Sequence, residues 1–138
     1  MRAHVMTPTR RELLQHVRSA PGSSTRALAR RAGLDESTTA YHLARLARVG
    51  LVVEERAGNA VAHFPNGWGD ARARRYATLS TEARVALAVL ADLGVARAAE
   101  VARWSGIPIG AARHALALAE KRGLARRTNK RGFFEVVA

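Results

Sequence analysis

The sequence predicts a mainly α-helical protein with small β-hairpins, arranged as two similar units. Three observations lead to this prediction. Apolar residues recur at helical spacing through most of the chain, short alternating runs flank glycine-containing turns, and the second half repeats the first at a constant offset that places Gly106 on Gly33. Aromatic residues make up only 5% of the 138 residues, which favours two small cores over one large core.

The first helix is expected within "TPTRRELLQHVRSAPG". Thr7 is the candidate N-cap, Pro8 suits the first turn, and Pro21 with Gly22 ends the helix. The apolar positions at helical spacing, which we expect to face inward, are Leu13, Leu14 and Val17.

A short second helix is predicted by "SSTRALARRAG", with Ser24 as its cap. We expect Leu28 and Ala32 to face inward and Gly33 to end the helix in a left-handed turn.

A third helix is predicted from residue 36 to about residue 48, capped by Asp35 and ended by Gly50. Its expected inward face consists of Thr39, Leu43 and Leu46.

A β-hairpin follows the third helix. The runs "LVVEE" and "AVAHF" alternate as strands do, and Gly58-Asn59 supplies the turn between them. Two helices joined by a tight glycine-containing turn form a helix-turn-helix, and the hairpin behind them is a wing. Residues 1–66 are therefore predicted to be a winged helix-turn-helix domain.

Residues 67–79 are predicted to form a linker, with one or two helical turns around residues 70–77. Trp68 and Tyr76 are expected to hold this linker against one domain or the other.

A second winged helix-turn-helix domain is predicted over residues 80–138. Ser80 caps its first helix, whose expected inward residues are Val85, Leu87 and Leu90. Its "VARWSGIPIGAARHALALAEKRGLARR" aligns without a gap on "LARRAGLDESTTAYHLARLARVGLVVE". The two units agree at the turn glycine, at the core leucine, and at the glycine-leucine pair that ends the third helix. We expect Trp104 to pack against the linker or the other unit.

The second hairpin is expected in "ARRTNKRGFFEVV", with its tip at residues 130–132. Because Phe133 and Phe134 are neighbours in a strand, one should lie in the core and the other should face outward.

The charge balance favours an anionic polymer as the partner. Lys and Arg number 23 against 11 Asp and Glu, a formal net charge of +12, and such a surplus favours nucleic acid or an acidic membrane surface. Nearly all the basic residues are arginine, which forms forked contacts with phosphate and guanine.

Several classes of function are disfavoured. The absence of cysteine excludes disulfides, thiolate zinc sites and a cysteine nucleophile. The five histidines appear in no helical pairing with one another or with a suitable carboxylate, so no metal site is expected. No phosphate-binding glycine loop, G-x-S-x-G motif or pair of catalytic carboxylates is found, so we predict neither an enzyme nor a cofactor. Without a signal peptide or an apolar span, a cytoplasmic, nucleoid-associated protein with no membrane partner is expected.

The stretch 33–52 has the pattern "GL-x-x-S-T-x-x-Y-H-L-x-x-L-x-x-x-GLV". It resembles the helix-turn-helix of ArsR- and MarR-type winged-helix transcriptional regulators, especially the small archaeal ones. Residues 8–65 fit this module throughout, and residues 80–138 fit it more loosely. The resemblance implies contacts with bases and phosphates along the exposed start of the third helix, with the DNA backbone one turn later, and with a flanking phosphate or the minor groove from the wing. The residues at these places are, in turn, Ser37, Thr38, Ala40 and Tyr41, then Arg45, then Arg56.

The chain departs from this pattern in both units. Glu36 is an acid where a groove-facing residue is expected; it could accept a hydrogen bond from cytosine N4 or only improve the helix N-terminus. In the second unit Gly110, Ala111 and Ala112 replace the polar residues, leaving Arg113 and His114 as long polar groups. Its remaining basic charge suits contacts with phosphate and lies in Lys121, Arg122, Arg126, Arg127, Lys130 and Arg131.

We therefore predict a transcriptional regulator that binds double-stranded DNA, with sequence preference from the first unit and affinity or partner contacts from the second. One alternative is an architectural, nucleoid-associated protein with little sequence preference. Another alternative is a winged-helix adaptor for protein interactions, which would be favoured if Trp104, Ile107 and Ile109 are exposed. No small-molecule effector is evident, and a monomer or weak homodimer is expected.

Overall fold

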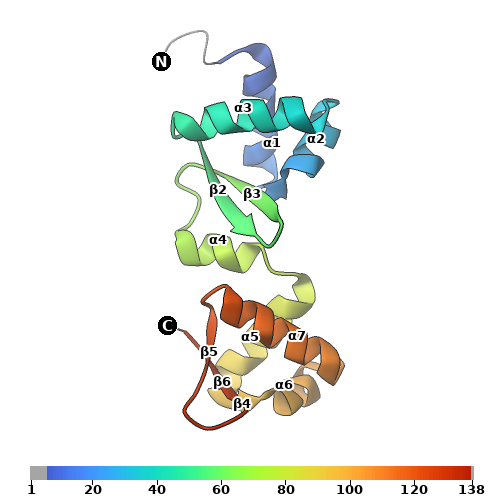
Figure 1. Cartoon of the computed structure of the whole chain (residues 1–138), viewed down its shortest axis with the longest axis vertical. Helices are drawn as coiled ribbons and strands as arrows, with labels where there is room; N and C mark the ends of the chain where they lie inside the picture. The colour runs from blue at the N-terminus through green and yellow to red at the C-terminus, as the bar shows by residue number, and fades with distance from the viewer. Residues whose placement is uncertain (1–5, 138) are drawn as a thin grey trace. The chain divides into compact units, whose positions relative to one another are not determined.

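The computed structural model of the protein describes residues 6–137. The chain forms two compact units, and the boundary between them falls between Arg74 and Arg75 (Figure 1). This boundary lies within the short helix α4 (Ala71–Ala77), in the stretch predicted as a linker.

Unit 1 contains the helices α1 (Pro8–Ser19), α2 (Thr25–Ala32) and α3 (Glu36–Arg48). Each begins at its predicted cap, because the side chains of Thr7, Ser24 and Asp35 accept hydrogen bonds from backbone amides in the first turn. Gly33, with φ of 68°, ends α2 in the left-handed conformation and sets the tight turn into α3.

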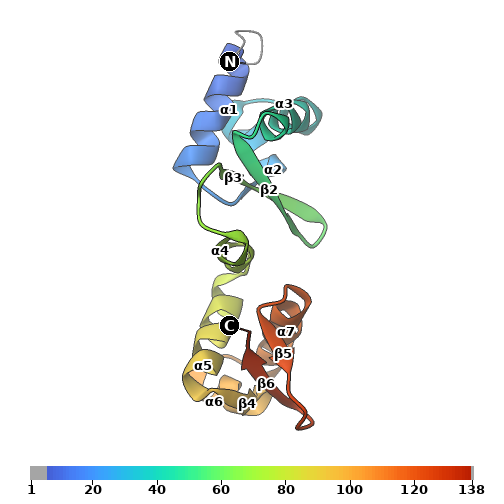
Figure 2. The same cartoon turned by 90° about the vertical axis from the view of Figure 1, so that its left-hand side faces the viewer.

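The sheet of unit 1 consists of β1 (Ser23–Ser24), β2 (Val52–Ala57) and β3 (Ala60–Pro65), which pair antiparallel in the order β1-β3-β2. Strands β2 and β3 form the predicted hairpin, which projects away from the helices of the unit (Figure 2). Arg56 lies opposite Val61 near the end of this hairpin.

The core of unit 1 is built from the apolar positions that the helical spacing predicts. Polar groups are also buried in this unit: the Nδ1 and Nε2 atoms of His63 lie 3.1 Å from the Ser23 carbonyl oxygen and 3.3 Å from the Glu54 carboxylate. The Trp68 ring stacks on Phe64 with centroids 4.8 Å apart, so Trp68 is held against unit 1. The main apolar cluster in the core of unit 1 consists of Leu13, Leu14, Val17, Leu28, Leu43, Leu46 and Val52.

Unit 2 contains elements in the same order. Its helices are α5 (Thr81–Leu93), α6 (Ala98–Ser105) and α7 (Ile109–Lys121), and each starts where the offset of the repeat places the start of its counterpart in unit 1. Its strands β4 (Val95–Arg97), β5 (Ala125–Arg127) and β6 (Phe133–Val136) pair antiparallel in the order β4-β6-β5.

Most buried residues of unit 2 lie at positions that the repeat matches to buried residues of unit 1. Leu116 and Val101 are as fully buried as Leu43 and Leu28, their counterparts in the repeat. Ser80 caps α5 as predicted, and Phe134 is buried while Phe133 is only partly covered. The buried cluster comprises Leu79, Ala83, Ala86, Leu87, Leu90, Ala96, Val101, Ala112, Ala115, Leu116, Ala119, Leu124, Ala125 and Phe134.

Two predictions for unit 2 are wrong. Val85 is 40% exposed, because the face of α5 that turns inward carries Ala83, Ala86, Leu87 and Leu90. Trp104, expected to pack, is 68% exposed. The face of α6 that packs inward includes positions 98, 101, 102 and 105, so position 104 falls on the solvent side of the helix.

Tyr76 lies in the last turn of α4, and its hydroxyl oxygen is 3.5 Å from the carbonyl oxygen of Arg84. Across residues 6–137, no helix combines the length and the hydropathy that a membrane span requires.

Candidate nucleic-acid interface

The outer face of α3 is open to solvent along its N-terminal half. Ser37 and Ala40 are exposed, and so is Tyr41 at 54%, whereas Thr39, Leu43 and Leu46 point into the core. The helical period thus separates a packing face from a face that is free to contact a partner.

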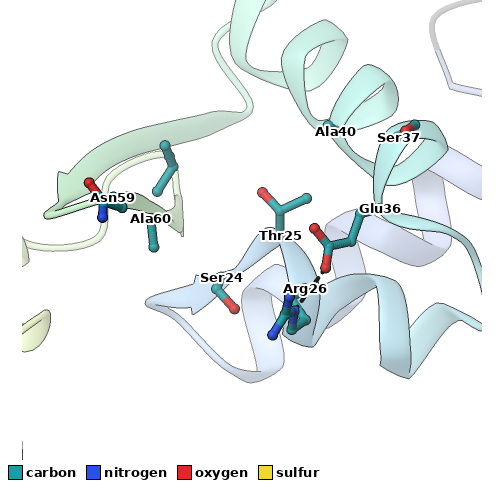
Figure 3. A pocket seen from close by; sticks show the side chains of 9 residues that line it. Ser24, Thr25, Arg26, Glu36, Ser37, Ala40, Asn59 and Ala60 are labelled. Carbon is teal, nitrogen blue, oxygen red and sulfur yellow. Dashed lines mark hydrogen bonds and ion pairs between the residues drawn. The ribbon is translucent and has the colours of Figure 1, made fainter.

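This exposed face borders a groove of about 620 Å³. The start of α2, the first turns of α3 and the tip of the β2–β3 hairpin enclose it (Figure 3). We call it groove 1. Its lining consists of Ser24, Thr25, Arg26, Glu36, Ser37, Ala40, Asn59, Ala60 and Val61.

Thr38 forms hydrogen bonds that stabilise the N-terminus of α3. Its amide and its hydroxyl both donate hydrogen bonds to the Asp35 carboxylate, at 2.7 and 3.1 Å. These bonds lower the pKa of Asp35 below its usual value. The Thr38 side chain is also partly covered. Among the predicted contact residues, Ser37 and Ala40 line groove 1, and Thr38 does not.

Glu36 is paired with a cation inside groove 1. The Arg26 Nε donates a hydrogen bond of 2.9 Å to a carboxylate oxygen of Glu36, and both side chains are largely exposed, at 74% and 56% (Figure 3). This hydrogen bond and the negative charge raise the pKa of Arg26. The acid that departs from the family pattern therefore adds no uncompensated negative charge to the groove.

Tyr41 lies among cationic groups. The guanidinium carbons of Arg10 and Arg45 lie 5.8 and 5.6 Å from the centre of its ring. The neighbouring His42 accepts a hydrogen bond at Nδ1 from the Nε of Arg10, and burial together with the charge of Arg10 lowers the pKa of His42. Arg45 is thus placed one turn after Tyr41, next to the surface that the resemblance assigns to it.

The wing arginine predicted for unit 1 is exposed. Arg56 lies on β2 outside the lining of groove 1, near the projecting end of the hairpin. The fold therefore brings Ser37 and Ala40 together in groove 1, places Tyr41 beside Arg45, and leaves Arg56 on the adjoining wing.

Unit 2 has a groove at the equivalent place, which we call groove 2, with a volume of about 660 Å³. Arg97, Ala98, Ala99 and Arg113 occupy the positions that Ser24, Thr25, Arg26 and Ala40 have in unit 1. Groove 2 is therefore more basic and has a more apolar floor than groove 1. Its lining is Arg97, Ala98, Ala99, Glu100, Arg113, Ala117, Arg127, Gly132 and Phe134.

The basic wing of unit 2 is partly paired with acids. Arg126 forms an ion pair of 2.7 Å with Glu135, and Arg127 one of 3.2 Å with Glu120. Lys130 lies 4.4 Å from the centre of the Phe133 ring, and Arg131 is exposed. Exposed ion pairs of this kind are weak, so the arginines remain available to an anionic ligand.

Sequence reasoning missed Arg26 and Arg97, which the fold brings from the start of α2 and from the end of β4 into the two grooves. The internal repeat gave no signal for them, because its offset places Arg97 on Ser24 and Arg26 on Ala99, and only the packing of the second helix beside the third brings each arginine to its groove.

The prediction about histidine pairing is wrong in one case. His16 and Glu12 lie one turn apart on α1, with 3.6 Å between His16 Nε2 and the carboxylate. In residues 6–137, no three side chains of His, Asp or Glu gather as metal ligands would. His4 lies outside the described residues.

Comparisons with known proteins show what the chain is similar to. Residues 5–55 match the model of a helix-turn-helix domain family. A predicted DNA-binding transcriptional regulator from E. coli is 30% identical over 46% of this chain and 67% of its own, with a TM-score of 0.43. The PcaV transcriptional regulator from Streptomyces coelicolor, solved with its natural ligand, is 29% identical over 45% of each chain, with a TM-score of 0.42.

A further solved structure aligns with most of the chain. The mRNA-binding domain of elongation factor SelB from E. coli, in complex with SECIS RNA, is 15% identical over 96% of this chain and all of its own, with a TM-score of 0.46. No curated protein matches the chain.

The helix-turn-helix with its adjoining hairpin defines the class: the chain has the winged helix-turn-helix fold, and residues 5–55 match a helix-turn-helix domain family. More particularly, the predicted resemblance to regulators of the ArsR and MarR type is confirmed.

Proposed function

We propose that the chain binds double-stranded DNA, with the N-terminal half of α3 in the major groove and the β2–β3 hairpin on the adjoining backbone. The observation that carries this proposal is groove 1, where the solvent-facing side of α3 meets the start of α2 and the tip of the hairpin. In winged helix-turn-helix proteins the second helix of the motif enters the major groove with its N-terminal residues near the bases. Ser37, Ala40 and Tyr41 occupy those positions.

The charge of the chain supports the same partner. A formal net charge of +12 over 138 residues favours phosphate, and arginine contacts release counterions from DNA. Arg45 and Arg56 supply such contacts at the end of α3 and on the wing.

Unit 2 contributes backbone contacts in this proposal. Its third helix carries Gly110 and Ala111 where unit 1 carries Ser37 and Thr38, so few groups there can read bases. The cations in and beside groove 2 are suited to phosphate: Arg113, Arg126, Arg127, Lys130 and Arg131. The two units then act as tandem domains that occupy neighbouring segments of one duplex.

The affinity for a duplex measured as a function of salt concentration tests the proposal. The logarithm of the binding constant should fall steeply with the logarithm of the salt concentration, with a slope that corresponds to several phosphate contacts. A slope equal to one contact or none would contradict it. Competition between genomic fragments and random DNA separates a regulator from an architectural protein, since a specific site should win by about a thousandfold or more.

The second candidate function, a protein-interaction adaptor, is favoured by the exposure of Trp104 and Ile109. A large apolar side chain at 68% exposure is suited to a partner surface. Changing Arg126, Arg127, Lys130 and Arg131 together to Ala separates the two functions of unit 2. Unchanged DNA affinity would favour a protein partner, and a large loss would favour DNA.

The proposal also includes the oligomeric state, which we take to be a monomer or weak homodimer. It includes no small-molecule effector and no enzymatic activity, and it locates the protein at the nucleoid. Sedimentation of the free protein checks the oligomeric state. Thermal unfolding in the presence of aromatic acids, sugars and nucleotides checks for an effector, because a ligand that binds the folded state raises the melting temperature.

A further inference from the structure

Glu36 is the carboxylate that, among the described residues, lines groove 1. It is the first residue of α3, and its side chain lies between the starts of α2 and α3 (Figure 3). A carboxylate on a DNA-facing surface is repelled by phosphate, so its presence there needs a compensating role.

We propose that Glu36 selects a C·G base pair in double-stranded DNA by accepting a hydrogen bond from cytosine N4, and that Arg26 is its positioning residue. This inference rests on the proposed function of groove 1 and names the base that it reads.

The chemistry of the carboxylate limits the base that it can contact. An ionised carboxylate only accepts hydrogen bonds, and in the major groove cytosine presents the N4 donor. Guanine N7 and O6 and thymine O4 are acceptors and would repel it, while adenine places the N7 acceptor beside its N6 donor. Glu36 at the N-terminus of α3 is in the part of the helix that approaches base edges.

Arg26 offsets the repulsion between the Glu36 carboxylate and the DNA phosphates. Its hydrogen bond of 2.9 Å holds the carboxylate in the free protein and offsets its negative charge as DNA approaches. Because both side chains are exposed at 74% and 56%, the pair is weak enough to rearrange. In the complex Arg26 turns to a phosphate while Glu36 turns to the base.

The internal repeat provides an independent observation. The positions of Arg26 and Glu36 are occupied in unit 2 by Ala99 and Ile109. Neither residue therefore has a counterpart at the equivalent position of unit 2, where groove 2 carries Glu100 and Arg97 at other positions. Arg26 and Glu36 are thus both present in the unit whose third helix carries polar groups, and both are replaced by apolar residues in the other unit.

The experiment is a selection of bound duplexes from a randomised pool with the full chain and with Glu36→Gln, Glu36→Ala and Arg26→Ala. Glu12→Gln is the matched control, since Glu12 is an exposed acid on α1 outside groove 1. Thermal unfolding of each variant confirms that the exposed substitutions leave the fold intact.

The wild-type chain and Glu12→Gln should enrich C·G at one position of the site, with about a tenfold preference over the other pairs. Glu36→Gln should move that preference to A·T, because glutamine pairs with adenine N6 and N7. Glu36→Ala should abolish the preference at that position alone. Arg26→Ala should weaken binding to all sequences and leave a reduced C·G preference.

Unchanged base preferences in Glu36→Gln and Glu36→Ala would overturn the inference while leaving the proposed function intact. Wild-type binding without any sequence preference would do the same. A wild-type chain that binds no duplex at all would instead refute the proposed function.

Discussion

The Nε of Arg10 donates a hydrogen bond of 3.0 Å to the Nδ1 of His42, a residue 32 positions away in sequence. The bond connects α1 to α3, and Arg10 is only 5% exposed at this junction. Because Nδ1 must be unprotonated to accept the bond, the neutral form of His42 belongs to the folded state. Tyr41 and Arg45 lie beside this contact, so α1 supports the face of α3 that we assign to DNA.

The stability of unit 1 should therefore depend on pH through His42. Burial and the charge of Arg10 lower its pKa in the folded state, so the unfolded chain binds the proton more readily near pH 6.5. The contribution is complete above that value and is lost as the pH falls through 6.5 towards the lowered pKa. The free energy of unfolding of the wild type should fall more between about pH 7 and pH 5 than that of His42→Gln.

Urea titrations at several pH values measure this difference. His16→Gln is the matched control, because His16 lies on the same helix as Arg10 but is paired with Glu12 and not with Arg10. Parallel curves for the wild type and His42→Gln would contradict the prediction.

Truncating a core leucine at equivalent positions of the repeat should destabilise only the unit that contains it. Leu43 and Leu116 are fully buried at equivalent places in α3 and α7. Replacing either by Ala leaves a cavity and costs about 2–5 kcal/mol. Hydrogen exchange followed by mass spectrometry should show lost protection in unit 1 for Leu43→Ala and in unit 2 for Leu116→Ala. Equal losses in both units for either variant would show that the units do not unfold separately.

The N-cap of α5 should contribute measurably to unit 2. The Ser80 hydroxyl accepts a hydrogen bond of 3.1 Å from the Ala83 amide, so Ser80→Ala should cost about 1 kcal/mol. Ser80→Asn should preserve most of the stability, because asparagine is an equally good cap. Chemical denaturation measures these differences, and the neighbouring exposed change Thr81→Ala should stay within about 0.5 kcal/mol of the wild type. A loss in Ser80→Asn as large as in Ser80→Ala would exclude the capping role.

The wing arginine of unit 1 should act on phosphate and not on bases. Arg56→Ala should weaken binding to all duplexes to a similar degree and reduce the salt slope by about one. The same measurement on Arg18→Ala, an exposed arginine of α1 outside groove 1, serves as the comparison. A change of base preference in Arg56→Ala, with the slope unaltered, would mean that the wing reads sequence.

Local signals predicted much of this fold correctly. Thr7, Ser24, Asp35 and Ser80 all cap the helices that they precede, because N-capping depends on residues within one turn. Gly33 takes the left-handed conformation for the same local reason. The helical period also predicted which residues of α3 are exposed and which are buried, while their role in binding stays a prediction.

The errors arose where the period alone does not say which face is covered. In α5 the helical spacing is compatible with Val85 on the core side, and only the packing of α7 against α5 turns Ala86 inward instead. Trp104 was expected to pack against the linker or the other unit, yet α6 buries its opposite side.

The order of elements, the caps, the turns and the internal repeat were determined by the sequence itself, because each depends on neighbours along the chain or on a direct comparison of its two halves. Only the tertiary structure decided that Arg26 meets Glu36 in groove 1, that Arg10 meets His42, and that Arg127 meets Glu120. Those contacts join different elements, and their geometry depends on how helices and strands pack together, which no local pattern records.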